Sequence, residues 1–356
     1  MKIAIQLMGL IAVLATILPL FKKSYWWIRI FDFPRAQITF FALASLILYS
    51  YYWDYNSLWE YILWLLLTGS AIYQAVRMFP YTFFAKKKTL PAKKYNKEAN
   101  FSLLVSNVYM YNERFQDYIN IVVNKFDPDM ILTLETGENW EEALRQIEDR
   151  YPYTIKKPLN NTYGMLLYSK LELIDPKIKF IVEKEVPSFH TKVKLKSGDE
   201  FAMHCLHPRP PRPSKLQDST NRDAELLLVG EELRESSFPT IVAGDLNDVA
   251  WSRTTKLFQK VSGLLDPRIG RGMYSTFDAK NPLLRFPLDH VFHSDHFKLM
   301  RIARSKYFGS DHFSMFIHFN YDPQEKEEQD TPNREEEDIK QAHEFINKSE
   351  INDNNI

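Results

Sequence analysis

Several apolar runs of this 356-residue chain end in asparagine, aspartate, glutamate or histidine, the residue types that bind metal ions or exchange protons. A single carboxylate after a strand is usually a turn residue. Six apolar runs that all end in these residue types are too many to be explained as turns alone. In α/β proteins, binding and catalytic sites form at the edges of sheets. We therefore expect a catalytic or metal-binding site built from Asn107, Glu135, His207, Asp245 with Asn247, Asp289, and Asp311 with His312.

The segments that carry these residues alternate between strand-like and helical patterns. Apolar, β-rich runs predict strands at 101–109, 130–134, 164–169, 193–195, 201–206, 240–243, 289–293, 299–303 and 313–319. Helical spacing predicts helices at 113–124, 140–150, 218–235 and 253–259. Because single strand–helix units mix with a hairpin signal at Ser197-Gly198-Asp199, we expect an α/β body with mixed sheets.

Four short motifs of this body occur in the order found in a known superfamily. They are Leu134-Glu135-Thr136, Gly244-Asp245-Leu246-Asn247, Leu288-Asp289-His290-Val291-Phe292 and Gly309-Ser310-Asp311-His312-Phe313. Together with Asn107 and residues 165–170, they make residues 101–319 resemble the endonuclease/exonuclease/phosphatase superfamily, which includes DNase I, exonuclease III-type endonucleases and neutral sphingomyelinases. The resemblance implies a DNase I-like α+β fold, a four-layer sandwich of two mixed β-sheets flanked by helices.

The same resemblance implies a metal-dependent hydrolase of phosphate esters, with Mg²⁺ or Mn²⁺ as the cofactor. Glu135 matches the metal ligand of the family, with Asp311 and Asn107 completing or orienting its shell. Asp245 and Asn247 match the residues that position the attacking water and a phosphate oxygen.

The resemblance also implies roles for the three remaining residues of the set. Asp289 is expected to pair with His312, fixing its tautomer and raising its pKa. His207 matches the histidine that protonates the leaving oxygen in the phosphodiesterase branch. In DNase-like members an upstream glutamate pairs with that histidine, but residues 156–159 read Lys-Lys-Pro-Leu here, so this chain departs from the pattern.

The proline-rich loop that follows His207 contains two arginines. Residues 207–213 predict a stiff connection to the next helix. Arg209 and Arg212 are the residues of this loop that suit a substrate phosphate, and a rigid linker without that role is the alternative. For His204 and His290 we expect structural hydrogen bonds.

The formal net charge is zero, yet the charges are distributed unevenly. Residues 1–80 have a net charge of +3 and residues 81–98 a net charge of +5, whereas residues 321–356 have a net charge of −8. Overall neutrality argues against a protein that coats nucleic acid, and a single cysteine excludes an internal disulfide framework. We predict a membrane anchor (1–80), a basic juxtamembrane linker (81–99), a catalytic domain (100–320) and an acidic, disordered tail (321–356), with one helical turn near residues 342–345 as the alternative for part of the tail.

The predicted anchor contains three uncharged runs, at 3–21, 36–53 and 61–76. Their lengths and the tyrosines and tryptophans at their ends predict about three transmembrane helices, with a buried helical hairpin as the alternative. Basic residues concentrate in 22–35 and 77–97. By the positive-inside rule, we expect an integral protein of the cell (inner) membrane whose catalytic domain is cytoplasmic.

Three functional hypotheses follow from these features. The first is a membrane-anchored nuclease-type phosphodiesterase that cleaves nucleic acid. The second is a lipid phosphodiesterase or phosphoinositide phosphatase, sphingomyelinase-like, which acts on phospholipid headgroups. The third is a catalytically silent binding domain, which the filled catalytic set disfavours. The expected partners are a phosphodiester substrate and the lipid bilayer, and no protein partner is predicted.

Overall fold

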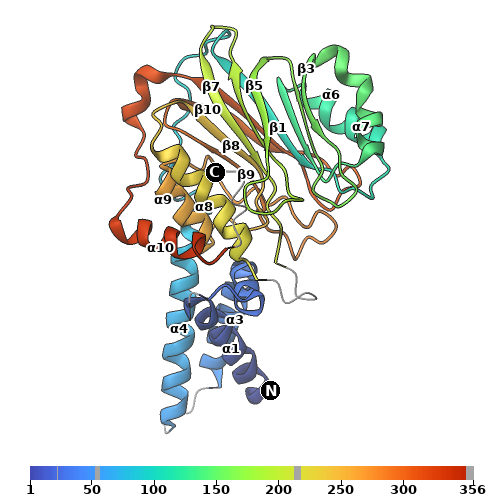
Figure 1. Ribbon diagram of the computed structural model, residues 1–356. Coiled ribbons are helices and arrows are strands. Elements are labelled where there is room, and N and C mark those ends of the chain that lie inside the picture. The colour runs from blue at the N-terminus through green and yellow to red at the C-terminus, as the bar shows by residue number, and fades with distance from the viewer. Residues whose placement is uncertain (22, 53–56, 212–217, 350–356) are drawn as a thin grey trace. The chain divides into compact units, whose positions relative to one another are not determined.

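The computed structural model describes residues 1–21, 23–52, 57–211 and 218–349 (Figure 1). Two compact units are present. The helical unit contains Met1–Lys86 and Pro211–Ser219, and the α/β body contains Lys87–Pro210 and Thr220–Ile356.

The helical unit consists of α1 (Lys2–Ile17), α2 (Trp26–Arg29), α3 (Arg35–Tyr51) and α4 (Leu58–Met78). Among the described residues, two helical stretches are long and apolar enough to cross a membrane, Lys2–Phe21 and Leu58–Tyr81, with mean hydropathies of 2.3 and 1.4. The stretches Trp26–Asp32 and Arg35–Tyr51 meet at a bend of 73°, and they make a third candidate span only if the bent pair counts as one. Three spans therefore stay a prediction.

Polar side chains join the three long helices of the helical unit. Arg35 donates to Gln74 Oε1 (2.9 Å) and pairs with Asp32, and Gln74 Nε2 donates to Thr16 Oγ1 (3.0 Å). All four of these residues are buried. Buried polar groups are costly without partners, so this network favours one packing of α1, α3 and α4.

The α/β body contains two mixed sheets (Figure 1). The first has the order β10-β11-β1-β2-β4-β3 and the second the order β5-β6-β7-β8-β9. In each sheet one strand pair is parallel, β1 with β2 and β7 with β8, and the other pairs are antiparallel. The strands are β1 (Asn100–Asn107), β2 (Met130–Leu134), β3 (Tyr153–Lys157), β4 (Met165–Ser169), β5 (Glu172–Lys179), β6 (Ser188–Lys194), β7 (Glu200–Leu206), β8 (Thr240–Asp245), β9 (Asp289–His293), β10 (Phe297–Arg304) and β11 (Met315–Tyr321).

The main core is a layer of apolar side chains contributed by both sheets. Phe101 of the first sheet stacks on Phe201 of the second, with ring centroids 4.5 Å apart. Alternate residues of β1, such as Leu103 and Val105, belong to this core, whereas Leu104 belongs to the cluster on the outer face of the same sheet. This period-2 alternation explains why strands buried on both faces appear as continuous apolar runs in the sequence.

Helices cover the outer face of each sheet. Residues 115–150, with α5 (Phe115–Asp117), α6 (Asn124–Phe126) and α7 (Glu138–Leu144), pack on the first sheet around Trp140. On the second sheet, α8 (Thr220–Arg234) and α9 (Arg253–Ser262) pack around Phe258. The predicted sandwich of two mixed sheets flanked by helices is confirmed.

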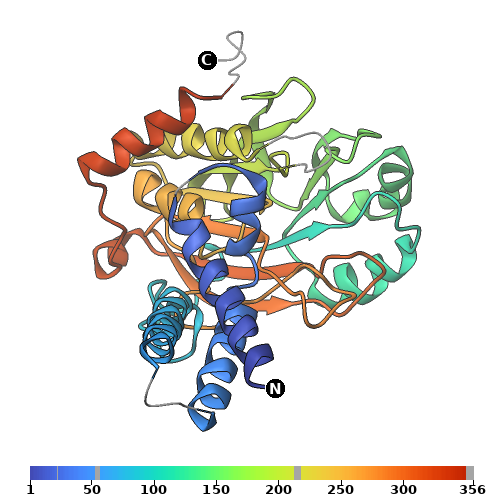
Figure 2. The same ribbon diagram turned by 90° about the horizontal axis from the view of Figure 1, so that it is seen from below.

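The acidic tail differs from our expectation. The single helical turn expected near residues 342–345 is part of a longer helix, α10 (Glu336–Ile346), which lies along α8 and contacts α9 (Figure 2). Ala342, Phe345 and Ile346 enter the apolar cluster of α8 and α9, and Lys260 pairs with Asp338 at 2.9 Å. Average composition hid an amphipathic helix, because its few apolar residues fall on one face. Residues 350–356 lie outside the described part of the chain.

Two strands were missing from our expectations. β3 and β5 have mostly exposed or partly exposed residues and therefore lack a continuous apolar run. The predicted helix at 113–124 is interrupted, because a π-helical segment, Tyr118–Val123, lies between α5 and α6. The predicted turn at 197–199 does connect β6 to β7.

Candidate active site

The strand arrangement brings the predicted residues to one edge of the sandwich. Asn107 ends β1, and Glu135 follows its parallel neighbour β2. In the second sheet, Asp245 ends β8 and lies opposite Asp289, the first residue of the antiparallel strand β9. His207 directly follows β7, whose last residue is level with Gly244 of β8.

Asn107 connects the two sheets at this edge. Its Nδ2 donates to Glu135 Oε1 at 2.9 Å and to Asp245 Oδ2 at 3.1 Å. Its Oδ1 accepts a hydrogen bond from the backbone N–H of Tyr109 at 3.0 Å. In this geometry the buried amide orients two carboxylates toward one another.

His312 lies between two carboxylates. Its Nδ1 is 2.8 Å from Asp289 Oδ2, and its Nε2 is 3.6 Å from Asp245 Oδ2. Burial alone would lower the pKa of His312, but Asp289 and Asp245 outweigh burial and raise this pKa to about 10. The imidazole is therefore a cation at neutral pH, as we expected for a histidine paired with Asp289.

The loop after β8 has an unusual backbone. Gly244 has φ +150°, and a Cβ there would lie 1.8 Å from the carbonyl oxygen of Leu206. Asn247 is left-handed, at φ +51°, and its backbone N–H donates to Asp245 Oδ1 at 2.9 Å. Asn247 Nδ2 donates to the carbonyl of Pro208 at 3.1 Å, which ties this loop to the residue after His207. Left-handed non-glycine residues cluster at functional sites, where surrounding contacts hold them.

Glu135 has a strongly perturbed carboxyl group and is itself left-handed, at φ +57°. Burial raises the pKa of Glu135 to about 7. The hydrogen bond from Asn107 and the charge of His312 lower this pKa, whereas the charges of Asp245 and Asp311 raise it further. A carboxylate held among other carboxylates in a desolvated pocket is a good cation ligand, because a metal ion offsets both penalties.

The oxygen donors of this edge fit a hard divalent metal ion. Glu135 and Asp311 supply carboxylates, and Asp289 Oδ1 is buried without a hydrogen-bond partner among the described residues. Ligand atoms of Asp245, Asp289 and His312 also lie within 4.8 Å of one another. Since Asp289 Oδ2 already pairs with the His312 imidazole, we expect Glu135 and Asp311 to hold the metal, with Asn107 orienting Glu135.

His207 lacks the acidic partner whose absence the sequence indicated. It is buried, and its Nδ1 has no hydrogen-bond partner among the described residues. Burial lowers the pKa of His207, with Asp245 opposing this effect and His312 adding to it. Lys156, which stands in the stretch where an acid was sought, instead pairs with Glu148.

Arg209, one of the two predicted phosphate-binding arginines, is paired with an acidic residue. Arg209 Nε lies 2.6 Å from Glu183 Oε2, and the guanidinium lies 5.1 Å from the centroid of the Tyr163 ring. Arg212 lies outside the described residues. A phosphate-binding role for either arginine stays a prediction.

Two buried arginines support the site in roles that were absent from our expectations. Arg222 of α8 donates to the carbonyl of Asn247 (2.6 Å) and to Asp248 Oδ2 (3.2 Å). Arg268 Nη1 donates to the carbonyl of Asp289 (3.2 Å), and its Nη2 lies 2.6 Å from His290 Nδ1.

His290 completes this support. Its Nε2 lies 2.9 Å from the carbonyl of Asp248. Because Arg268 can only donate, His290 Nδ1 must accept and Nε2 must carry the proton. The structural role expected for His290 is thus confirmed.

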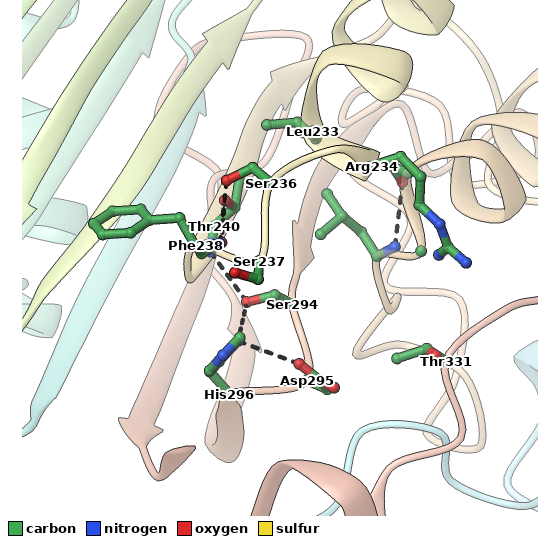
Figure 3. Close-up of a pocket in the computed structure, with 13 residues that line it drawn as sticks. Leu233, Arg234, Ser236, Ser237, Phe238, Thr240, Ser294, Asp295, His296 and Thr331 are labelled. Carbon is green, nitrogen blue, oxygen red and sulfur yellow. Dashed lines mark hydrogen bonds and ion pairs between the residues drawn. The ribbon is translucent and has the colours of Figure 1, made fainter.

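A separate cavity of about 230 Å³ lies at the opposite edge of the second sheet (Figure 3). It is lined by the ends of α8 and α9, by Thr240 at the start of β8 and by Ser294 after β9. Ser294 Oγ accepts from the backbone N–H of Thr240 (3.0 Å) and lies 3.0 Å from His296 Nδ1. Since Asp245 and Asp289 are at the other ends of these strands, this cavity is not the candidate active site.

A fold and a charged edge of this kind define a metal-dependent hydrolase of phosphate esters. Residues 104–312 match the model of the Endonuclease/Exonuclease/phosphatase family, and the chain belongs to this family. Among solved structures, similar ones are D. rerio TDP2 complexed with a single-strand DNA product (17% identity, TM-score 0.52) and an endonuclease/exonuclease/phosphatase from Bacteroides vulgatus (16%, 0.51). They cover 62% and 63% of this chain and 99% of their own.

The human Nocturnin catalytic domain with bound sulfate is also similar, at 16% identity and a TM-score of 0.50, covering 68% of this chain and 99% of its own. These likenesses support the DNase I-like fold. A search of curated proteins gives no match.

Proposed function

We propose that this chain is a membrane-anchored, Mg²⁺-dependent phosphodiesterase of the nuclease type. The observation that carries the proposal is the hydrogen-bonded set at one sheet edge, in which Asn107 bridges Glu135 and Asp245 while Asp289 holds His312. The catalytic set of the family pattern is present from Asn107 to His312, and only the acidic partner of His207 is missing.

The residues of the set have complementary tasks in hydrolysis. A bound divalent ion, held by Glu135 and Asp311, supplies positive charge to the phosphate oxygens. Asp245, oriented by Asn107 and by the backbone N–H of Asn247, accepts a proton from the attacking water. The His312 imidazolium, fixed by Asp289, stabilises negative charge that grows on the phosphoryl oxygens.

His207 completes this set on the leaving-group side. It is neutral at pH 7 because burial lowers its pKa, so it acts as a hydrogen-bond donor to the leaving oxygen. Without a carboxylate partner at Nδ1, its protonated form is less populated than in a histidine paired with glutamate, so less of it is available as a general acid. We therefore expect substrates with good leaving groups to be hydrolysed fastest.

Nucleic acid is the first substrate class. The neutral charge of residues 99–320 argues against a long electrostatic groove, since phosphate-backbone binding needs clustered cations. A short contact near the scissile phosphodiester suits the few cations of the neighbouring segments, which are Lys280, Arg285 and Arg304.

A phospholipid headgroup is the second substrate class, in a sphingomyelinase-like or phosphoinositide phosphatase reaction. The observation that favours it is an exposed leucine pair, Leu283 and Leu284, on a loop bonded to Asp311. Exposed apolar loop tips suit a lipid interface better than a nucleic-acid backbone.

Location in the cell membrane with a cytoplasmic catalytic domain is part of the proposal. It is supported by the apolar helical stretches and by the basic residues at 22–35 and 77–97. A reporter fused after Ile356 is expected to be exposed to the cytoplasm. Exposure on the outer face would contradict three spans.

Hydrolysis assays on the full chain in detergent test the activity. Substrates are single- and double-stranded nucleic acid, sphingomyelin, phosphoinositides and bis-p-nitrophenyl phosphate, each with Mg²⁺ or with chelator. We expect chelator-sensitive cleavage that Glu135→Ala and Asp245→Asn abolish. Full activity in either variant would refute the site assignment.

A further inference from the structure

The exposed apolar side chains of the α/β body concentrate beside the candidate active site. Among its described residues, eight large apolar side chains are exposed, and four of them lie on loops that adjoin the site. These four are Tyr111 (67% exposed), Leu283 (76%), Leu284 (48%) and Tyr307 (41%). Single exposed apolar residues are normal, but a gathering around one edge marks an interaction surface.

The loop that carries the two leucines is built into the site. Its ends are joined by pairing of Phe277 with Phe286, and Asp278 N–H donates to the carbonyl of Leu284 at 3.1 Å. Ala279 N–H donates to the carbonyl of Asp311 at 2.7 Å. The leucines therefore project from a hairpin that is anchored directly on a predicted metal ligand.

Cations surround this hairpin and lie against aromatic rings. Lys280 Nζ is 5.1 Å from the ring centroid of Tyr109, the second residue after Asn107. The guanidinium groups of Arg285 and Arg304 are 5.1 and 4.2 Å from the ring of Phe313. The hairpin 277–286 contains Lys280 and Arg285 against one acidic residue, Asp278, so its net charge is positive.

Arg114 lies on the neighbouring loop, where its Nε donates to Asp117 Oδ2 at 2.6 Å. Its guanidinium lies 5.9 Å from the ring centroid of Tyr307, and a Cβ at Gly309 would lie 2.8 Å from its Cδ. The loop after β1 and the loop before β11 therefore touch, and together with the hairpin 277–286 they form one rim. We call these three loops, 108–114, 277–286 and 305–309, the apolar rim.

We propose that the apolar rim is a lipid-binding surface that inserts Leu283 and Leu284 into the headgroup region of an anionic bilayer. Leucines flanked by lysine and arginine, with tyrosines nearby, are the composition of interfacial membrane-binding segments. The cations complement anionic headgroups. Leucines cannot stack on bases, and cations already cover one face of Tyr109, Tyr307 and Phe313, so the rim suits lipid better than single-stranded nucleic acid.

This surface would place lipid headgroups at the mouth of the site. The inference rests on the proposed membrane location but not on the identity of the substrate. The catalytic edge would then make its own reversible contact with the membrane, in addition to the predicted anchor in residues 1–80.

The test uses the single cysteine of the chain. Cys205 is fully buried, so a cysteine at position 283 can be labelled selectively with an environment-sensitive fluorophore. The labelled Leu283→Cys chain is reconstituted at full length into phosphatidylcholine vesicles with and without phosphatidylglycerol. Lys196→Cys is the matched control, because Lys196 is exposed in the turn between β6 and β7, at the far end of β7 from His207.

Quenching by nitroxide-labelled lipid is the readout. We expect the label at 283 to be quenched at least about twofold more than the label at 196, and more strongly with phosphatidylglycerol present. Equal quenching at both positions would overturn the inference. Protection of the 283 label from iodide by a single-stranded oligonucleotide, without lipid quenching, would also overturn it and assign the rim to nucleic acid.

Hydrolysis of bis-p-nitrophenyl phosphate by the same samples separates this inference from the proposed function. Lipid quenching without hydrolysis would leave the rim in place and refute the enzymatic mechanism. Hydrolysis without lipid quenching would refute the rim alone. A Leu283→Ser, Leu284→Ser variant is expected to keep hydrolysis of the soluble diester while losing lipid contact.

Discussion

The guanidinium of Arg222 is the connection through which α8 holds the loop that carries Asn247. It is 3% exposed and pairs with Asp223 (2.7 Å) and Asp248 (3.2 Å), which are themselves 0% and 1% exposed. Its remaining Nη1 donates to the carbonyl of Asn247 at 2.6 Å. One side chain therefore neutralises two buried carboxylates and fixes a left-handed residue.

Arg222→Gln removes the charge and leaves both carboxylates buried with weaker partners. Breaking a buried ion pair by removing one partner costs about 3–5 kcal/mol, so we expect that loss of unfolding free energy. For a body of this size it corresponds to a fall in Tm of roughly 6–20 °C. Arg222→Lys keeps the charge but cannot serve three acceptors, so a smaller loss is expected.

Activity well below the Tm separates positioning from folding. Displacement of Asn247 and Asp245 by about 1 Å is expected to reduce kcat on the order of 10²-fold while KM changes little. Arg145→Gln is the matched control, because Arg145 pairs only at the surface, with Glu142, and both side chains are more than 60% exposed. If Arg222→Gln matched Arg145→Gln in Tm and in kcat, the account of this support would be wrong.

Three further predictions concern the metal, the leaving group and the tail. The pKa of Glu135 is raised to about 7, so protons compete with the metal ion below that pH. We therefore expect the Mg²⁺ concentration for half-maximal hydrolysis to rise as pH falls from 8 to 6. A constant Mg²⁺ requirement over this range would argue against Glu135 as a ligand. His207→Asn is expected to slow cleavage of an alkyl phosphodiester about 10²-fold or more but a p-nitrophenyl ester far less, and equal losses for both would exclude an acid role. Phe345→Ala, at the α10 contact with α8 and α9, is expected to cost about 3 kcal/mol in thermal or denaturant unfolding, whereas an unchanged stability would mean that α10 does not hold the body together.

The pairing of strand ends explains why the site could be predicted from sequence. Asn107, Glu135 and Asp245 each stand at the end of an apolar run. Once the sheets form, the ends of paired strands lie side by side at one edge, so these residues come together. The left-handed backbone at Glu135 and Asn247 carries no comparable signal, since the sequence there contains neither a glycine at that position nor a turn dipeptide.

The supporting residues and the tail could not be predicted for a different reason. Arg222 and Arg268 act through contacts between distant segments, and no local periodicity encodes such contacts. In the tail, the average composition suggested disorder, but stability depends on where Ala342, Phe345 and Ile346 fall on the helix. Position on a helix face was more informative here than composition.

The central claim is that Glu135 holds a divalent metal for phosphodiester hydrolysis. The most direct test is the rate of bis-p-nitrophenyl phosphate hydrolysis by the full chain in detergent, titrated with Mg²⁺, for the unaltered protein and for Glu135→Gln. The account predicts hydrolysis that saturates with Mg²⁺, stops with chelator, and falls at least about 10³-fold in the variant, since metal-assisted charge stabilisation is the largest contribution to such a reaction. Hydrolysis that is unaffected by chelator, or equal in the two proteins, would contradict it.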